Sequence, residues 1–205
     1  MTTSTSLGVE DLGSAAQRDR RKRILDATLA LAGEGGFDAV QMRSVAERAD
    51  VALGTLYRYF PSKIHLLVSC MAREFEKSTR LALAGPIPGD NAADRVIHVL
   101  RNSGRGFQVN RKVADALTRA FMFADASVKD EIHAVGDLLT NIVTHAIDPE
   151  RDGEPSEHDR AVARIIGDVW LSALVAWVTG RLSDRETAAY MDQSVRIVLG
   201  ASAEN

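Results

Sequence analysis

The stretch "MRSVAERADVALGTLYRYFPSK", residues 42–63, constrains the fold more than any other part of the chain. Apolar residues recur at three- and four-residue spacings on both sides of Asp50, which predicts two short helices separated by a tight turn. Pro61 must end the second helix, because the residue before a proline avoids helical geometry. Two short helices joined in this way match a helix-turn-helix, whose second helix enters the major groove of DNA.

The rest of the chain also has helical spacing and no alternating strand pattern, so we expect an all-α protein. A first helix starts near Arg18 and ends at "GEGG", where a left-handed glycine is the usual cap. A phosphate-binding loop is the alternative there, but no strand precedes the glycines and no Gly-Lys-Ser/Thr follows them. Ser62 can cap the next helix. We expect these further helices: 62–84, 92–107, 111–124, 127–147, 157–181 and 184–201.

Breakers and composition divide the chain into three parts. Residues 1–17 are polar, lack the layout of a secretory signal and are predicted to be a disordered tail. Residues 18–66 form the predicted helix-turn-helix DNA-binding domain, and 67–205 a helical domain for effector binding and dimerisation. No apolar run approaches the roughly 18 residues of a membrane span, so we expect no membrane partner. The single cysteine, Cys70, cannot form an internal disulfide, which favours the cytoplasm.

Charge is unevenly distributed. Residues 18–63 carry nine Lys or Arg against six Asp or Glu, whereas 64–205 carry sixteen against twenty. This asymmetry favours an amino-terminal part that faces nucleic acid. The basic run "RDRRKR" at 18–23 could reach an adjacent phosphate backbone or minor groove, and a solvated helix start is the equal alternative.

The second helix of the motif has an inward and an outward face. Leu56 and Phe60 are expected to point into the core, which leaves Tyr57, Arg58 and Tyr59 to project outward toward phosphates or base edges. Gly54 would let the helix start approach DNA closely, Thr55 offers a hydroxyl to phosphate, and Lys63 adds a cation after the proline. Taken singly, residues of these types are more often ordinary surface or packing, and it is their arrangement that predicts DNA contact.

Residues 24–67 closely resemble the TetR family of transcriptional regulators. The family's pattern is matched by Gly36-Phe37, Arg43, Val45-Ala46, Ala49, Val51, Gly54-Thr55-Leu56-Tyr57, Phe60, Lys63 and Leu66. Gln41 and Ala52 stand where the family usually has Thr and Ser caps, and Asp50 replaces the usual turn glycine. The resemblance implies an operator-binding homodimer on double-stranded DNA. It also implies the DNA contacts Arg43, Leu53, Gly54, Thr55, Tyr57, Arg58, Tyr59 and Lys63.

The last two helices fit dimerisation. The helix at 157–181 is apolar over more than one face, which requires a partner as well as a core, although a purely central helix is the alternative. Gly167 would permit close helix approach. The residues of this broad apolar surface are Ile165, Ile166, Val169, Trp170, Ala173, Leu174, Ala176 and Trp177.

The second domain is also expected to hold a pocket for a lipophilic effector. Apolar side chains at helical spacing are more often plain packing, so each candidate stays open. The pocket candidates are Leu100, Phe107, Leu117, Phe121, Met122, Leu138, Leu139, Trp170 and Trp177.

Within the family, "AQRDRRKRILDATLALA" and "DVALGTLYRYFPSKIHLLVSCMAREFE" look like the KstR-type repressors of actinobacterial sterol catabolism. That likeness implies control of steroid or cholesterol breakdown genes and a steroid-derived effector, possibly a coenzyme A thioester. Cations that could hold such a thioester are Arg101, Arg105, Arg111 and Lys112.

Three other functions were weighed against this one. An enzyme is disfavoured, because five histidines form no His-Glu-x-x-His pattern, no Gly-x-Ser-x-Gly elbow occurs and no cysteine pair exists. We therefore expect no catalytic residues, no metal site and no cofactor. A TetR-type regulator of efflux or fatty-acid metabolism remains open. So does an effector-free DNA-binding protein, although the large second domain argues against it.

Overall fold

The computed structural model describes residues 9–108 and 110–200, without the side chains of 9–14 and 104–108. Over this part of the chain every regular element is a helix, which confirms the predicted all-α class. The elements are α1 (Val9–Ala39), α2 (Met42–Arg48), α3 (Leu53–Tyr59), α4 (Lys63–Ala82), α5 (Ala92–Gln108), α6 (Arg111–Met122), the 3-10 helix η1 (Ala126–Val128), α7 (Lys129–Ile147), α8 (Glu157–Val178) and α9 (Asp184–Val198).

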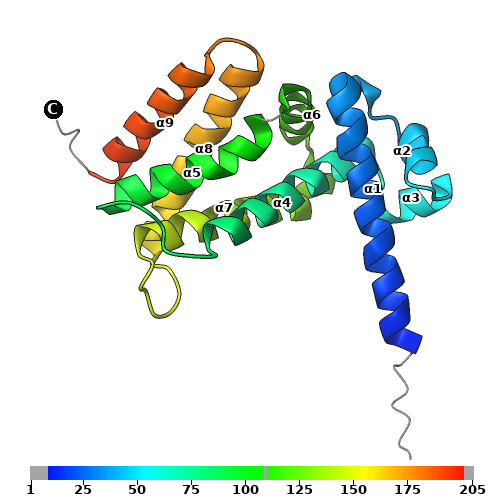
Figure 1. Ribbon diagram of the computed structural model, residues 1–205, viewed down its shortest axis with the longest axis horizontal. Coiled ribbons are helices and arrows are strands. Elements are labelled where there is room, and N and C mark those ends of the chain that lie inside the picture. Colours follow the sequence, from blue (N-terminus) through cyan, green and yellow to red (C-terminus); the bar gives the residue numbers. More distant parts are fainter. Residues whose placement is uncertain (1–8, 109, 201–205) are drawn as a thin grey trace, which may run out of the picture.

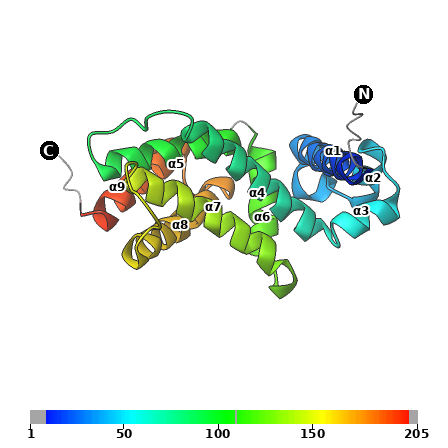
Figure 2. The ribbon, with the colours of Figure 1, turned by 90° about the horizontal axis from the view of Figure 1, so that it is seen from below.

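The helices form two groups. The first three lie together at one end of the molecule, and α4 runs from them into a larger bundle with α5 to α9 (Figure 1). The view from below shows the same division, with α4 and α6 next to the small group (Figure 2). Because α4 belongs to both groups, it connects them directly.

The first helix differs from its predicted bounds at both ends. It begins at Val9, so residues 9–17 are helical and do not belong to a disordered tail, while the rest of the predicted tail, 1–8, lies outside the described residues. At the "GEGG" run, Gly35 and Gly36 leave helical geometry, and Gly36 has φ of +71°. The glycines therefore interrupt the helix as predicted, and a further turn continues to Ala39.

The three-helix unit is built around a buried apolar centre that includes Leu25, Val45, Leu56 and Phe60. The turn between α2 and α3 is made by Asp50, which has φ of +52° and so adopts the left-handed conformation expected of it. Both helices start without a side-chain cap, as the sequence predicts for Gln41 and Ala52. The turn thus keeps its shape although the usual glycine and caps are missing.

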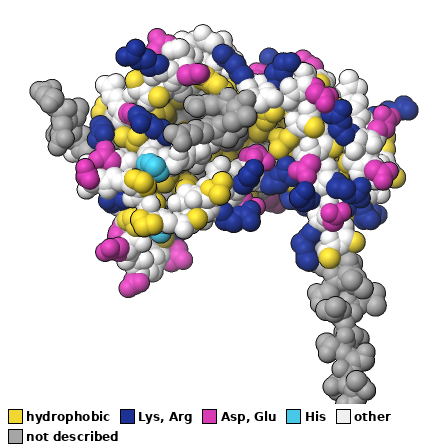
Figure 3. Space-filling model, viewed as in Figure 1, with side chains coloured by type: hydrophobic (Ala, Val, Ile, Leu, Met, Phe, Trp, Pro, Cys, Tyr) yellow, Lys and Arg dark blue, Asp and Glu magenta, His cyan; other side chains and the backbone are white. Residues whose placement is uncertain are grey.

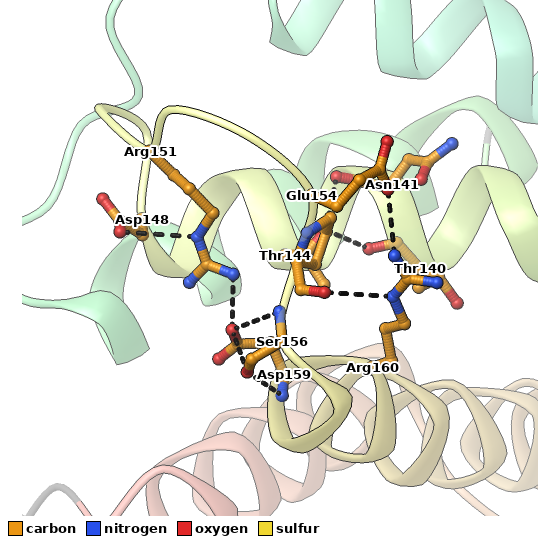
Figure 4. Close-up of polar contacts among 10 residues, drawn as sticks. Thr140, Asn141, Thr144, Asp148, Arg151, Glu154, Ser156, Asp159 and Arg160 are labelled. Atoms are coloured by element: carbon orange, nitrogen blue, oxygen red, sulfur yellow. Dashed lines mark hydrogen bonds and ion pairs between the residues drawn. The ribbon is translucent and has the colours of Figure 1, made fainter.

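The turn between α7 and α8 is fixed by charged side chains (Figure 4). Arg151 pairs with Asp148 and Asp159, and Ser156 and Asp159 form a capping box at the start of α8. The hydrogen bond from Arg151, followed by the bond from Ser156, holds the pKa of Asp159 below its ordinary value. These bonds hold the segment that follows α7 against the first turn of α8.

The longest apolar helix of the bundle is α8, and two expectations about it need correction. By length and composition alone it could cross a membrane, contrary to the expectation that no run comes near that length. Its packing explains the composition, because Ile166, Trp170, Ala173, Leu174 and Trp177 are buried inside the protomer. These five therefore cannot belong to a dimer face, whereas Ile165 is exposed, and Val169 and Ala176 are half-buried.

Close approach of α8 to its neighbour uses the predicted glycine. A Cβ added at Gly167 would lie 2.9 Å from Cδ2 of Leu139 on α7. The absent side chain therefore lets α7 and α8 pack closely at this point.

Candidate nucleic-acid interface and effector cavity

The outward face of α3, the second helix of the helix-turn-helix, is open to solvent. Leu53 is 40% exposed and Tyr57 46% exposed, and Arg58 is also exposed. Gly54 is exposed, and a Cβ added there would meet no atom within 4 Å. The inward face is formed by Leu56 and Phe60, as predicted. This arrangement offers a ring, a guanidinium and an open backbone to a partner.

Three of the expected contacts are less exposed than the others. Tyr59 is half-buried and packs against the core, with its ring centroid 6.3 Å from that of Phe60, so it does not project outward as expected. The ammonium of Lys63 lies 3.7 Å from the ring centroid of Phe37, and burial lowers its pKa, with Asp38 acting in the opposite direction. Thr55 is half-buried at the first turn of α3.

Basic side chains surround this face. Arg43 on α2 is well exposed and forms an ion pair with Glu47 at 3.0 Å. An exposed pair of this kind contributes little stability, so Arg43 can exchange its carboxylate for a phosphate at low cost. On the face seen in Figure 3, Lys and Arg side chains gather around α1. Not all are free, because Arg23 donates to the carbonyl of Ala49 at 2.7 Å.

The small unit is joined to the bundle through α6. Asn110 caps α6 by accepting from the backbone N–H groups of Lys112 and Val113, and it also donates to the carbonyl of Gly33 on α1. Lys112 donates to the carbonyl of Glu34 at 2.8 Å. The start of α6 thus supplies hydrogen-bond donors to two carbonyls of α1 that lie just before its interruption at Gly35 and Gly36.

A second junction lies at the start of α4. Ser62 caps this helix as predicted, and its hydroxyl is 2.9 Å from Nδ1 of His65. On the other side of the ring, Nε2 of His65 is 3.0 Å from the carbonyl of Ser127, just before α7. The buried imidazole therefore links the segment that follows α3 to the helix that lines the bundle's interior.

The bundle contains a cavity of about 430 Å³ between α4, α6, α7 and α8. Met71 and Phe75 of α4 form one wall, Phe121 of α6 another, and Leu139 and Trp170 come from α7 and α8. Its charged or ionisable lining residues are His133, Asp137, Arg164 and Asp168, all exposed. A space of this volume with apolar walls and a polar mouth suits a small lipophilic molecule.

The nine pocket candidates divide into several groups. Phe121, Leu139 and Trp170 line the large cavity. Leu100 and, again, Trp170 border a smaller one, and Leu138 faces a surface hollow between α4 and α7. Leu117 and Trp177 are buried in the core and border none of these spaces, and Met122 is 58% exposed on the outside. Phe107 is among the side chains that the structure does not describe.

Sequence reasoning missed the contribution of α4 to this cavity. Met71 and Phe75 are four residues apart, which places them on one helix face, but the same spacing is expected for a packed core. Gly136 and Gly167 were also missed as lining residues. The packing of α7 beside α8 places both glycines at the cavity, where Gly136 has open space around it and Gly167 is covered by Leu139.

The four candidate cations are engaged elsewhere or not described. Arg101 pairs with Asp192 of α9, and Lys112 donates to α1. Arg111 donates to the carbonyl of Trp177 at 2.6 Å and its guanidinium lies 5.4 Å from that ring's centroid. The side chain of Arg105 lies outside the described residues. Arg111 and Lys112 therefore hold helices together and do not stand at the large cavity's mouth.

A protruding helix-turn-helix joined to a bundle with an internal cavity defines the class: a two-domain DNA-binding regulator. Residues 24–70 match the family described as "Bacterial regulatory proteins, tetR family", and residues 89–198 match "Tetracyclin repressor-like, C-terminal domain". The chain belongs to the TetR family, and within it to the KstR type. It is accordingly a transcriptional regulator and not an enzyme.

Relatives and solved structures agree with this membership. The chain is 50% identical to the "HTH-type transcriptional repressor KstR" of Mycolicibacterium smegmatis, over 100% of this chain and 98% of the relative. It is 53% identical to the protein of the same name from Rhodococcus jostii, over 96% and 91% of the two chains. The crystal structure of a TetR transcriptional regulator from Rhodococcus sp. RHA1 is 28% identical and superposes with a TM-score of 0.82, covering 90% and 97%.

Proposed function

We propose that this chain is a repressor that binds a palindromic operator as a homodimer and is released by a steroid-derived effector, in particular a coenzyme A thioester. Its targets would be genes of steroid or cholesterol catabolism. The observation that carries the proposal is the course of α4, which begins three residues after Phe60, the buried residue that ends the reading helix α3, and lines the effector cavity with Met71 and Phe75. The 48–53% identity to repressors named KstR supports the steroid assignment.

DNA contact is proposed for the outward face of α3 and its surroundings. Tyr57, Arg58 and the open backbone at Gly54 would face the major groove, with Thr55, Leu53, Arg43 and Lys63 around them. Tyr59 would contribute only its exposed edge, because the rest of its ring packs on the core. A DNA-bound regulator of this kind works in the cytoplasm.

Dimerisation is proposed for the outer surfaces of α8 and α9. Ile165 is 49% exposed and Ile197 71% exposed, and Tyr190 is also exposed on α9. A partner helix pair would bury these side chains, and a two-fold dimer would place two α3 helices about 34 Å apart, one helical turn of DNA.

Release would follow from a population shift. An effector can release the protein from its operator only if it binds more tightly to a conformation in which the two α3 helices no longer fit adjacent half-sites. Contacts with Met71 and Phe75 would move α4, and the His65 link to Ser127 would couple α7 to the same end of that helix.

The proposal is tested by fluorescence anisotropy with a labelled fragment of the promoter next to the chain's own gene. We expect dimeric binding whose affinity falls steeply with salt, as phosphate contacts require. Addition of a steroid acyl thioester should release the DNA, while a fatty acyl thioester of equal charge should not. Equal release by both would overturn the steroid assignment, and no DNA binding at low salt would overturn the operator site.

A further inference from the structure

A second, smaller cavity of about 70 Å³ lies between α5, α8 and α9. Its lining includes Ile97 and Leu100 of α5, Trp170 of α8 and Met191 of α9. Two charged residues, Arg101 and Asp192, also border it. A space of this size is too small for a whole effector and can receive only an end group.

Trp170 borders both the large and the small cavity. Its ring meets that of Phe75 edge-on, with centroids 5.1 Å apart, and the side chain is 9% exposed. The indole therefore stands as a partition between the two spaces. A rotation of this side chain would join them into one elongated site.

The outer wall of the small cavity is an ion pair between α5 and α9. Nε of Arg101 lies 3.2 Å from Oδ1 of Asp192, and a second, shorter contact joins the same two side chains. Another ion pair links the same helices, Arg196 to Asp94 at 2.7 Å, but neither of its residues borders the cavity. The two helices thus share one pair at the cavity and one away from it.

The two cavities differ in what charge they accept. At the mouth of the large cavity, the two carboxylates of Asp137 and Asp168 outnumber the single guanidinium of Arg164, and the imidazole of His133 lies beside them. This mouth disfavours an anion. In the small cavity the guanidinium of Arg101 faces one carboxylate, and a ligand anion could take its place at the guanidinium if the partly exposed Asp192 side chain turned to solvent.

We propose that the two cavities are compartments of one effector site, divided by Trp170, and that Arg101 binds the anionic end of the effector in place of Asp192. This rests on the proposed function, in which a lipophilic effector occupies the large cavity. The apolar body would fill the large compartment. The anionic end group, a carboxylate, would displace Trp170 and reach Arg101 from inside.

The test measures binding of three ligands that share one apolar body: a keto-steroid carboxylic acid, its methyl ester and its coenzyme A thioester. A Trp177→Phe background leaves Trp170 as the reporting tryptophan, so ligand passage changes its fluorescence. We expect the acid to bind about tenfold more tightly than the ester, as a charge-assisted hydrogen bond allows. The thioester carries its anions on a head far larger than the small cavity, so its affinity should not depend on Arg101, and a loss of its affinity in Arg101→Gln would contradict the assignment of the small cavity to the anionic end.

Substitutions separate ligand binding from a merely structural ion pair. Arg101→Gln should abolish the preference for acid over ester, whereas Asp192→Asn should strengthen acid binding because it removes the competing carboxylate. Arg196→Gln, the matched change in the other α5–α9 pair, should leave the preference unchanged. If the pair only held α5 to α9, the Arg101 and Asp192 variants would shift binding in the same direction.

The outcomes distinguish this inference from the proposed function. Equal affinity for acid and ester, unaffected by Arg101→Gln, would overturn the role of Arg101 while leaving a lipophilic effector in place. An unchanged Trp170 signal on binding would overturn its role as the partition. If none of the three ligands binds or alters operator affinity, the proposed function itself fails.

Discussion

On the surface of α3, Gly54 leaves an open space where any other residue would place a side chain. Nothing in the protein fills that space within 4 Å, so the protein itself does not require glycine there. Gly54→Ala should therefore leave the free energy of unfolding unchanged or raise it by up to about 1 kcal/mol, because alanine has the better helix propensity. It should nevertheless weaken operator binding, because the new methyl group stands between the helix and DNA.

Gly136 provides the matched control. It also lies in a helix with nothing within 4 Å of an added Cβ, but it is on α7, away from the reading helix. Gly136→Ala should raise stability in the same way and leave operator affinity unchanged. Chemical denaturation and anisotropy measure the two effects, and wild-type DNA affinity in Gly54→Ala would contradict close approach at this site.

Tyr57 is exposed, so its contribution should appear in binding and not in folding. Tyr57→Ala is expected to keep the free energy of unfolding within about 0.5 kcal/mol and to weaken operator binding by about 1–3 kcal/mol. Tyr57→Phe removes only the hydroxyl, so it separates the contribution of the hydroxyl to operator binding from that of the ring. Leu81→Ala, which removes an exposed side chain from the far end of α4, should change neither quantity.

At the scale of elements, α3 begins without a capping side chain. Ala52 has an extended backbone and no side-chain hydrogen bond at this N-terminus. Ala52→Ser should add a bond to a free backbone N–H and stabilise the protein by about 1 kcal/mol. Ala30→Ser, in the exposed middle of α1, should instead cost a few tenths of a kcal/mol. Thermal unfolding of the two variants measures both effects. A loss of stability in Ala52→Ser would contradict the claim that the N-terminus of α3 lacks a capping bond that serine can supply.

The α7–α8 turn predicts a pH effect of definite sign. Hydrogen bonds from Arg151 and Ser156 hold the pKa of Asp159 below its value of about 3.9 in an unfolded chain. Its stabilising effect is therefore complete above that pH and is lost as the pH falls through the lowered pKa. Asp159→Asn should destabilise the protein near neutral pH and progressively less below about pH 4. Asp152→Asn, which removes an exposed charge from the same turn, is the control for the change in net charge.

The helices themselves could be predicted from the sequence, because each carries its own spacing and breakers. The site could be predicted only where a single helix decides which side chains face out, as for Tyr57 and Leu56. Tyr59 is less exposed because it packs on the core, and Lys63 because it lies over the ring of Phe37. The spacing of residues within one helix cannot predict such contacts with other parts of the chain. Likewise, the sequence predicts Arg111 and Lys112 as cations available to a ligand, whereas in the structure they donate to carbonyls of Trp177 on α8 and Glu34 on α1.

At the scale of the whole molecule, operator binding requires two chains. Ile165→Asp or Ile197→Asp should leave helix content unchanged but place a charge in the proposed dimer face. We expect monomers in sedimentation and a large loss of operator affinity, because a single α3 reads one half-site. Leu81→Asp, on α4 at a position as exposed as Ile197, should remain dimeric. A dimer that survives both isoleucine changes would place the interface elsewhere.

The contact between Asn110, Lys112 and the end of α1 has a practical consequence. The carbonyls of Gly33 and Glu34 receive their donors from a helix that follows them by more than seventy positions. A fragment trimmed to the amino-terminal three helices would lose both donors and fray at that end. We therefore expect that α1 to α3 do not form an independent folding unit, and that a fusion protein carrying them would also need α6.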